Sequence, residues 1–255
     1  MTRKYVFGPV SSRRLGVSLG VDLVPLKSCP LDCIYCEARA TTLLTMERKE
    51  YVPVDRVIEE LNDILMTAPE LDFITFSGSG EPTLNSRIGD VIRFVKRDFP
   101  QYKICLLTNG LLLGDRELQA DIAGIDLLIP SLDASNAAEY EKINRPISSM
   151  PFEKFTGILK DYLPQAPMPV HLELFIVPGV NDSEMSIARF AELIRALEVD
   201  RIQLNTLDRP GAVADIECAD EATVLRFIRG LASVAAVDAV GKYSYLTGKR
   251  SSFER

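Results

Sequence analysis

The chain has 255 residues, of which 47% are hydrophobic and 25% charged, and its formal net charge is −7. This composition is ample for a sizeable core and argues against a broad phosphate-binding surface. The N-terminal stretch MTRKYVFGPVSSRR lacks the apolar core of a signal peptide, and no run of about 18 apolar residues follows, so we expect a cytoplasmic protein without a membrane segment. Five cysteines, three of them bunched, do not resemble a disulfide framework and favour a reducing compartment.

Strand-like and helix-like segments alternate along most of the chain. Short apolar runs bounded by turn residues predict strands at residues 17–24, 72–76, 103–107, 127–130, 171–177 and 201–205. Apolar stripes of helical period predict helices over residues 54–65, 88–99, 115–122, 136–143, 152–163, 183–197 and 220–232. We expect Asn85 or Ser86 to cap the second of these helices. The strands mostly lack polar alternation, which is typical of a parallel sheet covered by helices.

Six such units predict an α/β fold built as a partial, open (βα)6 barrel of the TIM type. We expect a single domain over residues 1–255, with an N-terminal segment and first strand over 1–25, a core over 26–210, and a C-terminal helix and cover over 211–255. Residues 234–255 show no clear pattern. The stretch GKYSYL within them is expected to form either a strand or a cover over the open edge.

Each predicted strand ends in a loop of glycine and small polar residues. In chain order these loops contain CPLDCIYC, SGSGEPT, TNG, SLD, PGVND and NTLDRP. Active sites of βα barrels form from the loops that follow the carboxyl ends of different strands, so we expect all six loops to border one site. Taken singly, SGSGEPT and TNG are ordinary turns, and Ser131 and Asp133 are ordinary helix caps. Their shared face favours binding roles instead.

The strongest chemical signal is the trio Cys29, Cys33 and Cys36 in CPLDCIYC. Three thiolates at this spacing can hold three corners of one small iron–sulfur cube from a single loop, and they leave the fourth iron without a protein ligand. An open iron can bind a substrate or cofactor, which a cluster held by four cysteines usually cannot do. The sequence therefore predicts one metal centre, with these three cysteines as its ligands.

The pattern C-x-x-x-C-x-x-C with Tyr35 before the last cysteine resembles the signature of radical S-adenosylmethionine (radical SAM) enzymes. The resemblance runs from FGPVSSRRLGVSLGVDLVP to QLNTLDRPG. It implies one [4Fe–4S] cluster and S-adenosylmethionine as cofactors, and a low-potential electron donor of the flavodoxin or ferredoxin type as partner. In that family one electron from the cluster cleaves S-adenosylmethionine to methionine and a 5′-deoxyadenosyl radical, which abstracts hydrogen from a substrate.

The resemblance also implies contacts to S-adenosylmethionine, while it assigns no catalytic residue. The loop that meets the methionine amino group is expected to be Gly78, Ser79, Gly80 and Glu81, which reads Gly-Ser-Gly-Glu where many members have Gly-Gly-Glu. The residues expected near the carboxylate and ribose are Asn109, Ser131 and Asp133. The adenine is expected to pack against Val177, Gly179 and Asn181, with a backbone contact from Tyr35.

The run FGPVSSRRLGVSLGVD, together with CPLDCIYC, further resembles small proteins grouped with wyosine-type tRNA synthases. Those enzymes rebuild a guanine in tRNA by radical addition of a carbon fragment. This resemblance implies tRNA as a partner and an RNA base as the first candidate substrate. The archaeal enzymes carry a second cluster on cysteines ahead of the main motif, whereas no cysteine precedes Cys29 here.

Five side chains are candidates for substrate contacts. Arg13 and Arg14 have the geometry to fork onto a phosphate or carboxylate, and pairing with nearby acids is the equal alternative. Arg145 and Arg209 each precede a proline at the predicted active face and rank above the first pair as anion contacts. Asn205 begins the loop after the sixth strand.

Four further residues have competing interpretations. Lys27 either balances the charge of the cluster or is an exposed surface lysine. Cys105, inside KICLL, is expected to be a small buried residue, whereas Cys218 follows a loop over the active face. His171 is the only histidine and is expected to be structural.

Two other functions stay open at this stage. One is an activase that plants a glycyl radical on a partner enzyme, because those activases are also compact six-unit barrels. The other is a zinc or electron-transfer module without enzymatic activity. Zinc sites built on three cysteines usually add a fourth Cys or a His, and His171 is poorly placed for that.

Overall fold

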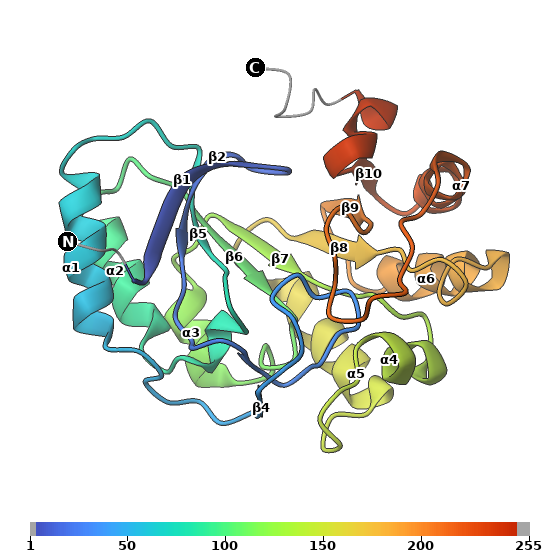
Figure 1. Cartoon of the computed structure of the whole chain (residues 1–255), viewed down its shortest axis with the longest axis horizontal. Helices are drawn as coiled ribbons and strands as arrows, with labels where there is room; N and C mark the ends of the chain where they lie inside the picture. Colours follow the sequence, from blue (N-terminus) through green and yellow to red (C-terminus); the bar gives the residue numbers. More distant parts are fainter. Residues whose placement is uncertain (1–3, 249–255) are drawn as a thin grey trace.

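The computed structural model describes residues 4–248, and its strands form two larger sheets that meet edge to edge (Figure 1). The first sheet has the order β1-β2-β5-β6-β7, with bounds Val6–Ser12, Gly16–Val21, Phe73–Phe76, Ile104–Thr108 and Leu127–Pro130. The second has the order β10-β9-β8, with bounds Ala236–Ala239, Arg201–Asn205 and His171–Phe175. Isolated parallel bridges from Leu128 to Val170 and from Ser131 to Glu173 join β7 to β8.

Every strand pair in these two sheets is parallel except the hairpin β1–β2. The parallel α/β core therefore confirms the predicted fold class, with β10 as a seventh parallel strand that the sequence did not predict. The stretch GKYSYL lies in a 3-10 helix, Gly241–Thr247, which contacts β10 and α7. The strand alternative for this stretch was therefore wrong. A separate two-stranded ladder pairs β3 (Ser28–Cys29) with β4 (Leu43–Leu44).

Seven α-helices lie at the predicted positions, within two residues at each end. Their bounds are α1 Val54–Leu65, α2 Ile88–Asp98, α3 Arg116–Ile122, α4 Ala137–Ile143, α5 Phe152–Tyr162, α6 Glu184–Arg195 and α7 Glu221–Leu231. The predicted cap of α2 was wrong, because Arg87 occupies the N-cap position and makes no side-chain cap bond. Asn85 instead accepts a hydrogen bond from the Arg87 backbone N–H at 2.9 Å, before the helix begins.

Helices and sheet bury one continuous apolar cluster that extends from Val6 to Ala239. α1 shows how the sequence produces this packing, since its buried residues recur at helical spacing: Val54, Val57, Leu61, Ile64 and Leu65. Among the described residues, no helix is long and apolar enough to cross a membrane.

The tip of the β1–β2 hairpin, residues 13–15, packs against strands of both larger sheets. Leu15 packs on Cys105, Leu127 and Ile129, and Arg14 pairs with Glu173 of β8. The pairing of β1 with β2 is irregular, because its register shifts between Phe7 and Val10, and Pro9 has no N–H. Side chains at the hairpin tip thus attach the hairpin to strands β6, β7 and β8.

Candidate active site

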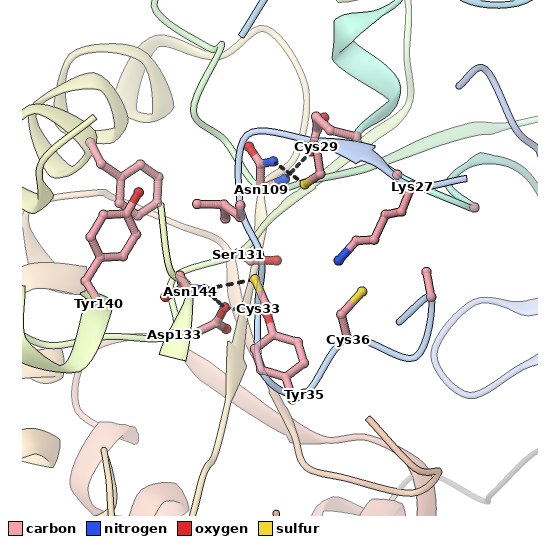
Figure 2. A pocket seen from close by; sticks show the side chains of 16 residues that line it. Lys27, Cys29, Cys33, Tyr35, Cys36, Asn109, Ser131, Asp133, Tyr140 and Asn144 are labelled. Atoms are coloured by element: carbon pink, nitrogen blue, oxygen red, sulfur yellow. Dashed lines mark hydrogen bonds between the residues drawn. The ribbon is translucent and has the colours of Figure 1, made fainter. Parts of the chain in front are cut away.

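The three cysteines lie on one loop that backbone hydrogen bonds fix to the end of α4. The N–H groups of Asp32 and Ile34 donate to the carbonyls of Asn144 and Ile143, each at 2.9 Å. The Cys36 N–H donates to the Cys33 carbonyl at 3.1 Å, which closes a tight turn between these two cysteines. Figure 2 shows the three sulfur atoms around one space, with the Lys27 ammonium directed into it.

This space is a cavity built from several elements. Its polar and charged lining comprises Lys27, Cys29, Cys33, Tyr35, Cys36, Glu81, Asn109, Ser131, Asp133, Tyr140 and Asn144. Its glycine and apolar lining comprises Leu31, Ala38, Gly78, Gly80 and Phe155. The loops after β2, β5, β6 and β7 therefore meet at one site, as expected for the carboxyl ends of parallel strands.

Two side-chain amides point at cysteine sulfurs. Asn109 Nδ2 lies 3.6 Å from Cys29 Sγ, and Asn144 Nδ2 lies 3.4 Å from Cys33 Sγ. Burial, with the charge of Glu81, raises the pKa of the Cys29 thiol to about 12, and burial raises the pKa of Cys33 as well. Without a bound cation both groups are therefore thiols at neutral pH, and a metal centre would have to displace their protons.

Lys27 supplies positive charge at the same place. Its side chain is 3% exposed, and its ammonium donates to the Arg39 carbonyl at 3.2 Å. Burial disfavours the ammonium, but attraction to Cys36 and the other two cysteines outweighs that cost and raises the pKa of Lys27. The exposed-lysine alternative was therefore wrong.

These residues fit an iron–sulfur cluster with one open corner. Three sulfurs face one cavity, two of them receive amide donors, and a buried cation faces all three. Within residues 4–248, no three His, Cys, Asp or Glu side chains are spaced to hold a single metal ion. His171 heads β8, and its Nδ1 lies 3.4 Å from Gln203 Nε2.

The loop after β5 presents Glu81 to the cavity. Its buried carboxylate accepts hydrogen bonds from the Thr83 hydroxyl at 2.6 Å, the Thr108 hydroxyl at 2.7 Å and the Asn109 N–H at 2.7 Å. Burial raises the pKa of Glu81, and these donors oppose the shift. Gly80 is required here, because a Cβ on it would lie 2.1 Å from the Ser28 carbonyl oxygen.

Asp133 connects the cysteine loop to β8. Its carboxylate accepts from Tyr35 OH at 2.5 Å, Asn144 Nδ2 at 2.9 Å and the Phe175 N–H at 3.0 Å. The Tyr35 and Phe175 rings stack with centroids 3.9 Å apart. Burial raises the pKa of Asp133 to about 6. Asp133 does not cap α4, whose N-cap is Asn136.

Comparison with known proteins decides the family. The model of the Radical SAM superfamily matches residues 23–191, about two thirds of the chain. The chain belongs to the radical SAM superfamily. Enzymes of this superfamily use a [4Fe–4S] cluster and S-adenosylmethionine, and membership removes the non-enzymatic zinc or electron-transfer alternative.

Two relatives align with most of this chain. A protein named GTPase Obg from Brachyspira hyodysenteriae is 37% identical over 208 residues, which is 81% of this chain and 30% of that protein. A UPF0026 protein of Helicobacter pylori strain 26695 is 34% identical over 212 residues, 81% of this chain and 67% of that protein. The chain thus spans less than a third of the first relative and about two thirds of the second.

Solved structures share the fold at low identity. A radical SAM methyltransferase from Sphaerobacter thermophilus superposes with a TM-score of 0.68 at 18% identity, covering 87% of this chain and 65% of that one. A structure of TYW1 with a lysine-pyruvate adduct bound gives a TM-score of 0.61 at 18% identity, with 86% and 74% covered. At this identity both likenesses show the radical SAM fold alone.

Four residues predicted to bind S-adenosylmethionine lie outside the radical SAM cavity. Ser79 bonds to Asp22 through both its N–H and its hydroxyl. Val177 packs against Ile34 and Phe175, and Gly179 donates its N–H to Asp182. Asn181 is fully buried and donates from Nδ2 to the carbonyls of Asp133 and Phe175, each at 2.8 Å. In this structure Asn181 therefore orients the Asp133 backbone.

The predicted substrate residues are spread around the cavity rather than gathered in it. Arg13 pairs with Glu37 at 3.0 Å and Asp208 at 2.9 Å, and Arg14 pairs with Glu173, which also accepts from Asn205. Arg145 and Arg209 are more open, with side chains 50% and 67% exposed. Pairing with nearby acids, the alternative stated for Arg13 and Arg14, is what the structure shows.

Sequence reasoning missed several lining residues, above all Asn144, Tyr140, Phe155 and Leu31. Asn144 is the C-cap of α4, and Tyr140 lies one turn earlier in the same helix. The sequence predicted a helix over residues 136–143, but nothing local predicted that Tyr140 and Asn144 face the cluster loop. Cys105 is fully buried, as expected, and Cys218 is partly exposed.

Proposed function

We propose that this chain cleaves S-adenosylmethionine reductively and uses the product radical to abstract hydrogen from a substrate. Cys29, Cys33 and Cys36 would hold a [4Fe–4S] cluster, which when bound supplies the electron for cleavage. The observation that carries the proposal is that these cysteines share one cavity with Glu81, Asn109 and Asp133. Radical SAM membership supports the same chemistry.

Glu81 is suited to bind an ammonium group. Its carboxylate is buried, and hydroxyl and N–H donors fix both its oxygens before any ligand arrives. A preorganised buried acceptor forms strong charge-assisted hydrogen bonds, because little rearrangement is needed. We assign Glu81 to the methionine amino group of S-adenosylmethionine, and Asn109 and Ser131 to its neighbouring polar groups.

Tyr35 and Asp133 would position the other end of the cofactor. The Tyr35–Asp133 hydrogen bond holds the cysteine loop against β7, and Phe175 supports the Tyr35 ring from behind. Leu31, Tyr140 and Phe155 give the cavity an apolar wall. Such a wall excludes water, which would otherwise screen the charges.

The test of this proposal is anaerobic reconstitution with iron and sulfide, followed by dithionite and S-adenosylmethionine. We expect 5′-deoxyadenosine as product. The Glu81→Ala variant should bind S-adenosylmethionine about tenfold to hundredfold more weakly, because a buried charged hydrogen bond is worth about 1.5–3 kcal/mol. Lack of cleavage by wild-type protein fully loaded with iron would contradict the proposal.

We further propose an RNA base as substrate, with tRNA as its carrier. The support is the resemblance of the run FGPVSSRRLGVSLGVD to wyosine-type synthases. Arg145 and Arg209 are the more exposed candidates for phosphate contacts, and their ion pairs, with Asp32 at 3.9 Å and Glu37 at 3.6 Å, are longer than the Arg13–Asp208 pair at 2.9 Å.

Mass spectrometry of nucleosides from total RNA, with and without this gene, tests the substrate. We expect a modified guanosine that disappears when the gene is removed. An unchanged nucleoside profile would remove the RNA substrate and leave cleavage of S-adenosylmethionine standing. Co-purification of a large glycyl-radical enzyme would instead favour the activase alternative.

A further inference from the structure

A single side-chain amide lies between a predicted cluster ligand and a buried carboxylate. Asn144 Nδ2 is 3.4 Å from Cys33 Sγ and 2.9 Å from Asp133 Oδ2 (Figure 2). An amide nitrogen carries two hydrogens, so both contacts can be made at once. Asn144 is 3% exposed, and water therefore does not compete for either hydrogen.

The backbone of Asn144 is fixed independently of its side chain. Its N–H donates to the Tyr140 carbonyl at 2.8 Å, which ends α4, and its carbonyl accepts from the Asp32 N–H at 2.9 Å. The same residue therefore anchors the cysteine loop and aims an amide at the sulfur. Because the backbone contacts do not need the side chain, the side chain can be altered while the anchor is kept.

The side-chain oxygen of Asn144 is also informative. Asn144 Oδ1 is buried and has no hydrogen-bond partner in the described part of the chain. Asn109 differs, because its Oδ1 accepts from the Leu111 N–H at 2.9 Å while its Nδ2 lies at 3.6 Å from Cys29 Sγ. The orientation of the Asn144 amide is thus set by its two donated bonds. Leaving a buried acceptor unpaired is costly, so the donations must offset that cost.

We propose that Asn144 is a positioning residue whose N–H···S bond to Cys33 raises the reduction potential of the cluster. The inference rests on the proposed function, since it assumes a cluster at these cysteines. Donors to a ligand sulfur stabilise the extra negative charge of the reduced state, and they act strongly in a buried site. The second bond, to Asp133, holds the amide in the orientation that the sulfur requires.

The test is a redox titration of the anaerobically reconstituted full chain, followed by electron paramagnetic resonance. In Asn144→Leu, which has the same branching and number of heavy atoms but no donor, the ratio of reduced to oxidised cluster at a fixed potential should fall about tenfold, or about 59 mV for one electron. Tyr35→Phe is the matched control, because it removes the other side-chain donor to Asp133 Oδ2 and leaves Asn144 in place. The reduction potential of the cluster in Tyr35→Phe should equal or exceed that of the wild type.

A second readout separates tuning from structural damage. If the potential is the cause, formation of 5′-deoxyadenosine by Asn144→Leu should fall with dithionite and recover with the stronger reductant titanium(III) citrate. A folding defect would not respond to the reductant. If Asn144→Leu takes up less iron than wild type, Asn144→Ala, which also lacks a donor, replaces it in both measurements.

The possible failures are distinct. Wild-type protein that takes up no iron would overturn the proposed function. Wild-type protein that cleaves S-adenosylmethionine, with variants of equal iron content and unshifted potential, would overturn only the role of Asn144. An equal fall in Tyr35→Phe would also overturn it, because the effect would then come from Asp133.

Discussion

Two regions of the barrel differ in whether their charged side chains are paired with opposite charges. At the cavity wall, formed by Glu81, Asn109, Asp133 and Asn144, buried polar groups converge on the space that the cysteines face. At the hairpin tip, residues 13–15, the arginines are neutralised by carboxylates of the same chain. The first region gathers polar groups around one cavity, whereas the second attaches the hairpin to β8.

The contrast is clear in two carboxyl groups, whose pKa values shift in opposite directions. Burial disfavours the charge of Glu173, yet Arg14 outweighs burial and lowers the pKa of that carboxyl. Within residues 4–248 no cation forms an ion pair with Asp133, and burial raises the pKa of Asp133 to about 6. Glu173 is thus held in an ion pair, whereas the raised pKa of Asp133 is typical of carboxyl groups at functional sites.

Removing a predicted cluster ligand tests the cavity side most directly and should have the largest effect. Cys33→Ser should lose the bound iron and all formation of 5′-deoxyadenosine, because three thiolates are the minimum set at this site. Iron analysis and product detection check this. Cys105→Ala, in the apolar cluster under Leu15, is the matched control and should keep its iron. Equal iron loss in both variants would contradict the assignment.

Breaking the Arg14–Glu173 pair tests the hairpin side. Arg14→Met keeps the side-chain length but leaves the Glu173 carboxylate buried without its cation, so we expect a loss of about 3–5 kcal/mol in the free energy of unfolding. Urea unfolding measures this. Arg56→Met, at an exposed ion pair with Glu59, should leave the midpoint unchanged. A small effect of Arg14→Met would remove the structural role of the hairpin tip.

The raised pKa of Asp133, in the cavity wall, predicts that the free energy of unfolding depends on pH. Because the pKa of Asp133 is raised in the folded state from 3.8 to about 6, its contribution to stability is complete below pH 4 and is lost as the pH rises to 6. The difference in unfolding free energy between wild type and Asp133→Asn, measured without metal, should fall by about 3 kcal/mol over that range. A difference that does not vary with pH would mean that Asp133 titrates normally.

The smallest expected effects on stability come from substitutions at two glycines, which should act in opposite directions. A Cβ at Gly80 would lie 2.1 Å from the Ser28 carbonyl oxygen, so Gly80→Ala should destabilise the protein by about 1–3 kcal/mol and disturb the loop that carries Cys29. A Cβ at Gly157, inside α5, meets nothing within 4 Å, and Gly157→Ala should stabilise by about 0.5–1 kcal/mol. Thermal unfolding of both variants, with opposite shifts, checks the pair.

The sequence predicted the helices and the parallel core well, because each element has a strong apolar period of its own. It missed β1 and β10 at the two edges of the sheet. β1 contains Pro9 and a register shift, and β10, with the sequence AVDA, is too short to show a period. Edge strands receive their conformation from a single neighbour, which local patterns do not show.

Some residues of the site were predicted from the sequence, and others were missed. Residues in loops directly after strands, such as Glu81, Asn109 and Asp133, were found because the topology brings those loops together. Asn144 was missed because it faces the site from the end of a helix, through a contact 111 residues away in sequence. The pairing of Arg14 with Glu173 could not be predicted, since it depends on how the hairpin tip crosses the barrel.

The outer edge of β1 bears on whether a second copy of the protein could pair with the sheet. Phe7 and Val10 are both more than 40% exposed on this strand, a combination that would invite a second copy to extend the sheet. The Glu60 carboxylate accepts from the N–H groups of Lys4, Tyr5 and Val6, and Pro9 offers none. The backbone donors at the start of this edge are therefore already used, and we expect the strand to resist pairing with a second copy despite its apolar side chains.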